Sequence, residues 1–107
     1  MKALSQFPCI LLSRDPIDFR KGRKSIAAFV QSVMNENPFN DTLYIFVNKR
    51  HDCVKALYWS KTGFAMWEKG LEKDRFPWPK KVAVDKIVIT HQQAEWLLDG
   101  IDILKIK

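Results

Sequence analysis

Residue types that would point to metal or redox chemistry are scarce in this chain of 107 residues. The two cysteines, Cys9 and Cys53, are too few for a disulfide framework, and neither has a second Cys or His at ligand spacing, so we expect both to be reduced and buried. Neither His51 nor His91 has a metal-ligand companion nearby. Glycine occurs four times and never forms a Gly-rich phosphate-binding loop. The sequence therefore predicts no metal site and no cofactor.

Long apolar stretches are missing as well. No window approaches the roughly 18 uninterrupted apolar residues of a membrane-spanning helix, and residues 1–10 lack the charged, apolar and small-residue order of a signal peptide. We therefore expect a cytoplasmic protein with no membrane partner. The length predicts one domain over residues 1–107 and excludes TIM barrels, complete dinucleotide-binding domains, kinases and the carboxylate-triad transposase core, which are all longer.

Catalytic constellations are absent from the sequence pattern. No pair of carboxylates is spaced to lie on one apolar face, and neither histidine stands in a Ser, Cys or Asp arrangement typical of nucleophilic catalysis. We therefore expect that the protein is not an enzyme. A small nuclease is an alternative, but metal-assisted phosphodiester hydrolysis needs clustered carboxylates, and the sequence places none together.

Positive charge is present in excess. Eighteen Lys and Arg residues against twelve Asp and Glu residues give a formal net charge of +6. Such a balance favours polyanions as partners without specifying a fold, and nucleic acid is the first candidate. A modestly basic, solvated surface is the alternative that charge alone leaves open.

Apolar patterning predicts an α+β domain: a mostly antiparallel sheet of four to five strands, a long helix packed on one face and a short C-terminal helix at an edge. The expected strands are 9–13, 43–47, 53–59, 64–68 and 82–89. The three strands in the middle of the chain are joined by polar turns, which is typical of an antiparallel meander.

Both expected helices have recognisable ends. The long helix is expected over residues 19–34, where apolar side chains recur at helical spacing, and Asp18 is expected to cap it by accepting backbone N–H bonds. The short helix follows Thr90, which begins a capping box. Gly100 is expected to end it in the left-handed conformation.

Basic side chains gather in three places along the chain. The first cluster lies around the expected start of the long helix and consists of Arg20, Lys21, Arg23 and Lys24. Cations there oppose the positive end of the helix dipole. Two interpretations stay open: a local network of Asp and Arg side chains that orients the turn, and a phosphate contact formed by the helix N-terminus and its side chains.

The second cluster is the tip of a hairpin, Asn48 to His51, continued by Lys55 on the following strand. Lys49 and Arg50 supply its charge. A two-stranded ribbon with a basic tip fits the major groove of DNA, but charged tips are also typical of solvated turns.

Aromatic residues interrupt the third cluster, which consists of Lys73, Arg75, Phe76, Trp78, Lys80 and Lys81. This pattern is typical of a surface that stacks an unpaired base and binds its phosphates. Alternatively, the aromatic side chains pin an ordered loop to the core, because large rings dominate core burial. The tryptophans Trp59, Trp67 and Trp96 lie within apolar patterns, so we expect them in the core or at its rim.

The order and spacing of several short motifs resemble a known family. The motifs are Asp18 to Gly22, Phe46 to Lys55, Leu57 to Trp59, Gly63-Phe64, Trp67, and Leu71 to Pro79. Over residues 10 to 102 the chain resembles the TnpB-type accessory protein that the second open reading frame of IS66 insertion sequences encodes. The resemblance implies a small bacterial protein that is made alongside a separate transposase and assists movement of the element, and it implies no known reaction.

Function and partners are therefore expected as follows. The leading hypothesis is a transposition accessory protein that binds element-end DNA or a transposition intermediate, with the transposase of the same element as a second partner. The residues expected to bind nucleic acid coincide with both the motifs and the basic clusters: Arg20, Lys21, Lys49, Arg50, Lys55, Arg75 and Trp78. The alternative is a protein adaptor that docks the transposase without contacting DNA, with exposed aromatics such as Trp78 as anchors.

Overall fold

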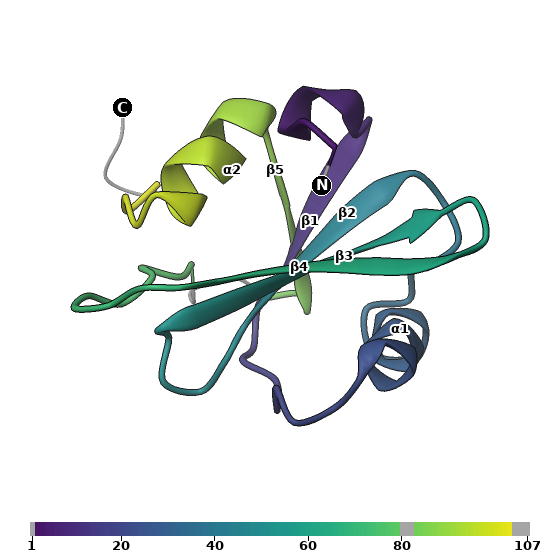
Figure 1. Ribbon diagram of the computed structural model, residues 1–107, viewed down its shortest axis with the longest axis horizontal. Helices are drawn as coiled ribbons and strands as arrows, with labels where there is room; N and C mark the ends of the chain where they lie inside the picture. Colours follow the sequence, from purple (N-terminus) through teal and green to yellow (C-terminus); the bar gives the residue numbers. More distant parts are fainter. Residues whose placement is uncertain (1, 80–82, 104–107) are drawn as a thin grey trace.

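The computed structural model describes residues 2–79 and 83–103. The strands are β1 (Cys9–Ser13), β2 (Thr42–Val47), β3 (Cys53–Ser60), β4 (Gly63–Gly70) and β5 (Lys86–Ile89). The helices are α1 (Arg23–Ser32), α2 (His91–Leu98) and a short 3₁₀ turn, η1 (Leu4–Gln6). The expected α+β fold is confirmed, with α1 and α2 on opposite sides of the sheet (Figure 1).

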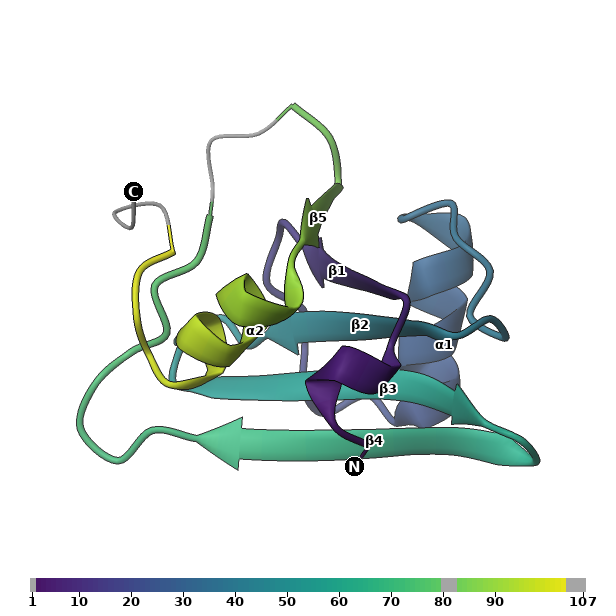
Figure 2. The same ribbon diagram turned by 90° about the horizontal axis from the view of Figure 1, so that it is seen from above.

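The sheet has the strand order β4-β3-β2-β1-β5. β1 and β2 pair in parallel, and α1 connects them as a crossover. The pairs β1–β5, β2–β3 and β3–β4 are antiparallel, so the sheet is mostly antiparallel and contains the expected meander. Figure 2 shows β2, β3 and β4 side by side, with α1 crossing behind them.

Two hydrophobic clusters hold the layers together, one on each face of the sheet. β2 is the central strand and is buried along its whole length because both of its faces are covered. Leu43 and Ile45 face the cluster that contains Leu97 of α2. Tyr44 and Phe46 face the cluster under α1. The alternation of the strand thus assigns successive side chains to different layers.

Three expectations about the helices are wrong. The long helix begins at Arg23 rather than at residue 19, and its N-cap is Gly22 without a side-chain hydrogen bond. Asp18 does not cap it, because its carboxylate accepts hydrogen bonds from the backbone and side chain of Arg20 instead. The short helix α2 packs over one face of the sheet rather than at an edge (Figure 1), because Leu97 and its neighbours bury their apolar stripe there.

The ends of α2 follow the sequence. Thr90 accepts a hydrogen bond from the backbone N–H of Gln93, and the Gln93 side chain accepts from the backbone N–H of Thr90, which completes the capping box. Gly100 has a positive φ of 84°, as expected of a left-handed helix stop. Strand β5 is shorter than the expected 82–89 and begins at Lys86; position 82 lies outside the described residues.

Residues 71–79 form an ordered loop that packs on the α2 side of the sheet. Phe76 and Trp78 are only 1% and 6% exposed and belong to the same hydrophobic cluster as Leu97. The indole N–H of Trp78 donates to the carbonyl oxygen of Ser13, 2.8 Å away. The interpretation in which aromatic side chains pin this loop to the core is therefore confirmed.

Both cysteines and the tryptophans Trp67 and Trp96 are partly exposed. Cys9 and Cys53 are free cysteines, as expected, but both are half-buried rather than buried. Trp67 and Trp96 are half-buried and pack against the cluster that contains Leu97, as expected of rim residues. The loops that follow β1, β2 and β4 lie together at one end of the sheet.

Candidate nucleic-acid interface

The turn between β2 and β3, residues 48–52, is held by Asn48 and is called the tip below. The Asn48 side-chain oxygen accepts the backbone N–H groups of Asp52 and Cys53, each at 3.1 Å. Its amide nitrogen donates to the Asp52 carboxylate at 2.7 Å. His51 takes a positive φ of 60° to close the turn. These bonds fix the backbone of the tip and leave Lys49 and Arg50 exposed on its outside.

The loop that follows β1 lies against one side of the tip. The backbone N–H of Ile17 donates to the carbonyl oxygen of Val47 at 3.0 Å, which attaches this loop to the end of β2. Asp18 then accepts the backbone N–H of Arg20 at 2.9 Å and its guanidinium at 2.8 Å. These hydrogen bonds hold the pKa of the Asp18 carboxyl well below its usual range, and the nearby charge of Lys49 lowers it further.

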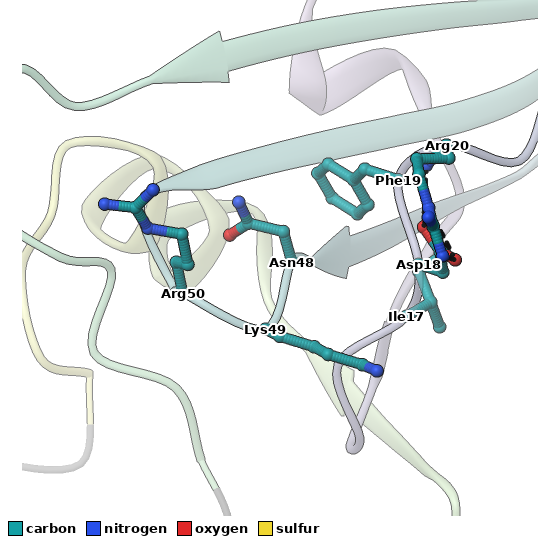
Figure 3. Close-up of a pocket in the computed structure, with 7 residues that line it drawn as sticks. All are labelled: Ile17, Asp18, Phe19, Arg20, Asn48, Lys49 and Arg50. Atoms are coloured by element: carbon teal, nitrogen blue, oxygen red, sulfur yellow. Dashed lines mark hydrogen bonds and ion pairs between the residues drawn. The ribbon is translucent and has the colours of Figure 1, made fainter.

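A hollow of about 470 Å³ separates this loop from the tip. Its lining residues are Ile17, Asp18, Phe19, Arg20, Asn48, Lys49 and Arg50. In Figure 3, the Lys49 side chain extends toward the loop of residues 17–20, whereas Arg50 points away from it. Basic groups from the first and second sequence clusters therefore meet around one concave surface.

A second hollow, of about 430 Å³, lies on the other side of the tip. The backbone N–H of Phe76 donates to the His51 carbonyl oxygen at 2.6 Å and attaches the third cluster to the tip. Lys49, Arg50 and Arg75 all line this hollow. The pKa of Asp52 is lowered, first by its hydrogen bond from Asn48 and then by the charges of Arg50 and Arg75.

The structure therefore brings together Arg20, Lys49, Arg50 and Arg75, which we call the basic ridge. The Arg20 side chain is 91% exposed while it contacts Asp18. The Arg50 side chain is 80% exposed, with its Nε 3.6 Å from the Asp52 carboxylate. Solvent-exposed pairs of this kind are weak, so both guanidinium groups are accessible to a competing anion.

Lys21 and Lys55 lie away from the basic ridge. Lys55 is only 13% exposed, and its ammonium group donates to the Phe19 carbonyl oxygen at 2.9 Å and lies 3.6 Å from Glu68. It also lies over the Phe19 ring, 4.9 Å from the centroid. These contacts bind the loop after β1 to the sheet, which is a structural role. Lys21 is exposed and lines a separate hollow beside Glu68.

The expectation that Trp78 is exposed is wrong. Its ring is only 6% exposed and its N–H donates to Ser13, so Trp78 reaches the surface only as part of the lining of the hollow beside Arg75. A tryptophan between two prolines in a charged segment looks like a surface residue in the sequence, but its neighbour Phe76 and the face of the sheet provide an apolar site that covers it.

Sequence reasoning placed Asn48 in the hairpin tip but did not predict its structural role there. Its function is to shape the tip. The sequence signal for this role is the Asn-x-x-x-Asp spacing between two strands, since Asn and Asp side chains commonly bind the backbone of tight turns.

In positions 2–79 and 83–103, no group of three or more His, Cys, Asp or Glu side chains is placed to hold a metal ion. No helix in this described part is long and apolar enough to cross a membrane.

Comparison with known proteins places the chain in a family. A family model described as IS66 Orf2 like protein matches residues 9–107. Two relatives come from Sinorhizobium fredii. The uncharacterized protein y4jC is 28% identical over 98 residues, which cover 92% of this chain and 83% of the relative. The uncharacterized protein y4hO is 33% identical over 85 residues, which cover 79% of this chain and 73% of the relative. No solved structure matches the chain. The resemblance found in the sequence motifs is thereby confirmed, and the chain belongs to the IS66 Orf2-like family of transposition-associated proteins.

Proposed function

We propose that this protein assists transposition by binding DNA through the basic ridge. The observation that carries the proposal is the convergence of four basic side chains from three separate segments of the chain. Lys49 and Arg50 lie on the tip, and Arg20 and Arg75 line the hollows beside it. Element-end DNA and the transposase of the same element are the proposed partners. The membership in a transposition-associated family supports a DNA substrate over other polyanions.

The shape of the basic ridge supports a groove-binding mode. β2 and β3 are inner strands of the sheet, so only the turn between them can approach the major groove of duplex DNA, and this turn carries Lys49 and Arg50 outward. Arg20 and Arg75 lie beyond hollows on either side of the tip, where the two phosphate backbones flank a groove. Their guanidinium groups give charge-assisted, bidentate hydrogen bonds to phosphate oxygens.

The proposal is tested by fluorescence anisotropy on labelled duplexes across a salt series. The triple variant Arg20→Glu, Lys49→Glu and Arg75→Glu removes three proposed phosphate contacts. We expect its duplex affinity at low salt to fall by at least about tenfold and its salt slope to flatten by about three, because each neutralised phosphate contributes roughly 0.9 to the slope.

A matched control separates local contact from overall charge. The double variant Lys2→Glu and Lys61→Glu changes two exposed positions outside the basic ridge, and it is compared with Arg20→Glu and Arg75→Glu, which makes the same change of formal net charge. The control should keep most of the duplex affinity. Equal losses in the two double variants would show that only net charge matters and would contradict the basic ridge. Preference for element-end over scrambled duplex would add sequence or shape readout.

Absence of duplex binding at low salt would favour the adaptor hypothesis instead. An adaptor captures the transposase from extract even after nuclease treatment, whereas a DNA-bridged complex is lost. The adaptor has no anchor at Trp78, which is buried, so any docking surface must use other residues.

A further inference from the structure

Three aromatic rings meet at the end of the β3–β4 hairpin opposite the tip. Trp59 and Phe64 are directly paired across the two strands, with ring centroids 5.1 Å apart. Phe39, from the segment between α1 and β2, lies 5.1 Å from Trp59 and 5.3 Å from Phe64. We call these three side chains the aromatic triad. Phe39 is 54% exposed, which is unusual for a large ring in contact with two others.

A hollow of about 670 Å³ lies between the aromatic triad and the beginning of α1. Its lining residues are Gly22, Arg23, Lys24, Ser25, Trp59, Thr62, Gly63 and Phe64. Phe39 is not a lining residue and lies beside the hollow, against the rings of Trp59 and Phe64. Arg23 and Lys24 are exposed, and the lining contains no acidic residue. The first turn of α1 also contains no acidic residue, so these cations stand at the positive end of the helix dipole, and Glu68 shares only a neighbouring hollow with Arg23.

We propose that this hollow and the exposed Phe39 ring beside it bind single-stranded nucleic acid, with unpaired bases stacked on the aromatic triad and phosphates on Arg23 and Lys24. The inference goes beyond the proposed duplex binding and uses different residues. Aromatic rings beside a cationic groove are the combination that single-strand binding requires, because every base has a flat face and every nucleotide a phosphate. The surface expected at Trp78 from the sequence is thus assigned to Phe39, Trp59 and Phe64 instead.

Competing occupants fit the hollow less well. Duplex DNA hides the faces of its bases in the stack, so it offers nothing to exposed rings. An acidic peptide matches the charge of Arg23 and Lys24 but leaves the exposed ring of Phe39 without a flat partner. A nucleotide strand uses both features of the hollow at once.

The test compares two strands that differ only in their bases. Fluorescence anisotropy is measured on a labelled oligothymidylate and on an abasic strand of the same length, which carries the same phosphates. The wild-type protein should prefer the oligothymidylate. Phe39→Ala should weaken oligothymidylate binding by about tenfold, the loss expected for one stacked base, and leave abasic binding unchanged.

Further variants separate stacking from charge and from folding. Lys24→Glu should weaken both strands, and Phe39→Tyr should keep the preference because it retains a ring. Val88→Ala is the matched control, since Val88 is 71% exposed on β5 at the other edge of the sheet. Phe39 lies outside the helices and strands, and circular dichroism of the Phe39→Ala variant checks that it is folded.

Three results would overturn the inference: equal wild-type affinity for the two strands, an unchanged preference in Phe39→Ala, or displacement of the oligothymidylate by polyglutamate as efficiently as by unlabelled strand. The last result would assign the hollow to an acidic protein. The triple variant of the basic ridge should retain the preference for bases over abasic sites, so failure of duplex binding and failure of this inference are distinguishable.

Discussion

Asn48 shapes the proposed interface although it carries no charge. One amide side chain makes three hydrogen bonds within the tip, to the backbone of Asp52 and Cys53 and to the Asp52 carboxylate. The directions of Lys49 and Arg50 depend on this turn. An alanine at the same position would leave the two backbone N–H groups without their shared acceptor.

Replacing Asn48 by Ala should therefore affect both stability and binding. We expect the free energy of unfolding to fall by about 1–3 kcal/mol, the usual cost of removing the partner of part-buried polar groups. Duplex affinity should fall as well, because the tip loses its fixed geometry. Lys49→Ala is the control: it should leave the unfolding free energy within about 0.5 kcal/mol and reduce only the affinity. Denaturant unfolding and anisotropy check both quantities, and an unchanged unfolding free energy in Asn48→Ala would contradict this role.

Lys55 and Trp78 show which residue roles the sequence cannot reveal. Both belong to basic or aromatic clusters, yet Lys55 binds the Phe19 carbonyl and Trp78 binds the Ser13 carbonyl, partners 36 and 65 positions away. A pattern of residue types contains no information about which distant backbone oxygen lies within reach. The exposure of long or aromatic side chains is therefore decided by tertiary packing.

Element boundaries were predictable where local chemistry decides them. The apolar runs predicted β1, β2 and β3, and the capping box predicted the start of α2. The start of α1 was placed too early, because the bond of Ile17 to Val47 attaches this segment to the sheet and the Asp18–Arg20 pair holds the following residues in a turn. Neither contact has a local sequence signal. Which face α2 covers depends likewise on the whole topology.

The capping box of α2 gives a prediction at the scale of the element. Thr90→Ala removes the hydroxyl that accepts the Gln93 backbone N–H, and we expect a loss of about 1 kcal/mol in the free energy of unfolding. Thr90→Ser keeps that oxygen and should be close to wild type. Thermal and denaturant unfolding of the two variants measure the difference. Equal stability of the two would mean that the cap contributes nothing to α2.

At the scale of the whole molecule, the sequence supplied the basic clusters but not their assembly. Arg20, Arg50 and Arg75 come together because the loops after β1, β2 and β4 are bonded to one another through Val47 and His51. These loops lie at the same end of the sheet because β1 and β2 are parallel, while β4 returns antiparallel to β3. Such convergence follows from strand order, which patterning predicts poorly.

The chain from Ile17 to Ser25 connects the two proposed sites. It lines the hollow beside the tip with residues 17–20, then a middle hollow with Lys21 and Arg23, and finally the hollow of the aromatic triad with residues 22–25. β3 runs between the same two ends, from Cys53 to Ser60, which at roughly 3.3 Å per residue is a distance of about 25 Å, less than the ~34 Å of one turn of duplex DNA. One nucleic acid with both a duplex and a single-stranded part can therefore follow this path.

A duplex with a thymidine tail should bind more tightly than either the blunt duplex or the free tail. Once the basic ridge holds the duplex, the tail reaches the aromatic triad at a high effective concentration, so the two affinities reinforce each other. An abasic tail of equal length keeps the phosphates and should give a smaller gain.

Two variants separate the contributions of the two sites. Phe39→Ala should remove the difference between the two tails while leaving the affinity for the blunt duplex unaffected. The triple variant of the basic ridge should weaken binding of the blunt duplex while still distinguishing thymidine from abasic strands. Anisotropy with the three ligands and the two variants measures each effect. Equal affinity of the tailed and blunt duplexes for the wild-type protein would mean that the two sites do not act on one molecule of nucleic acid.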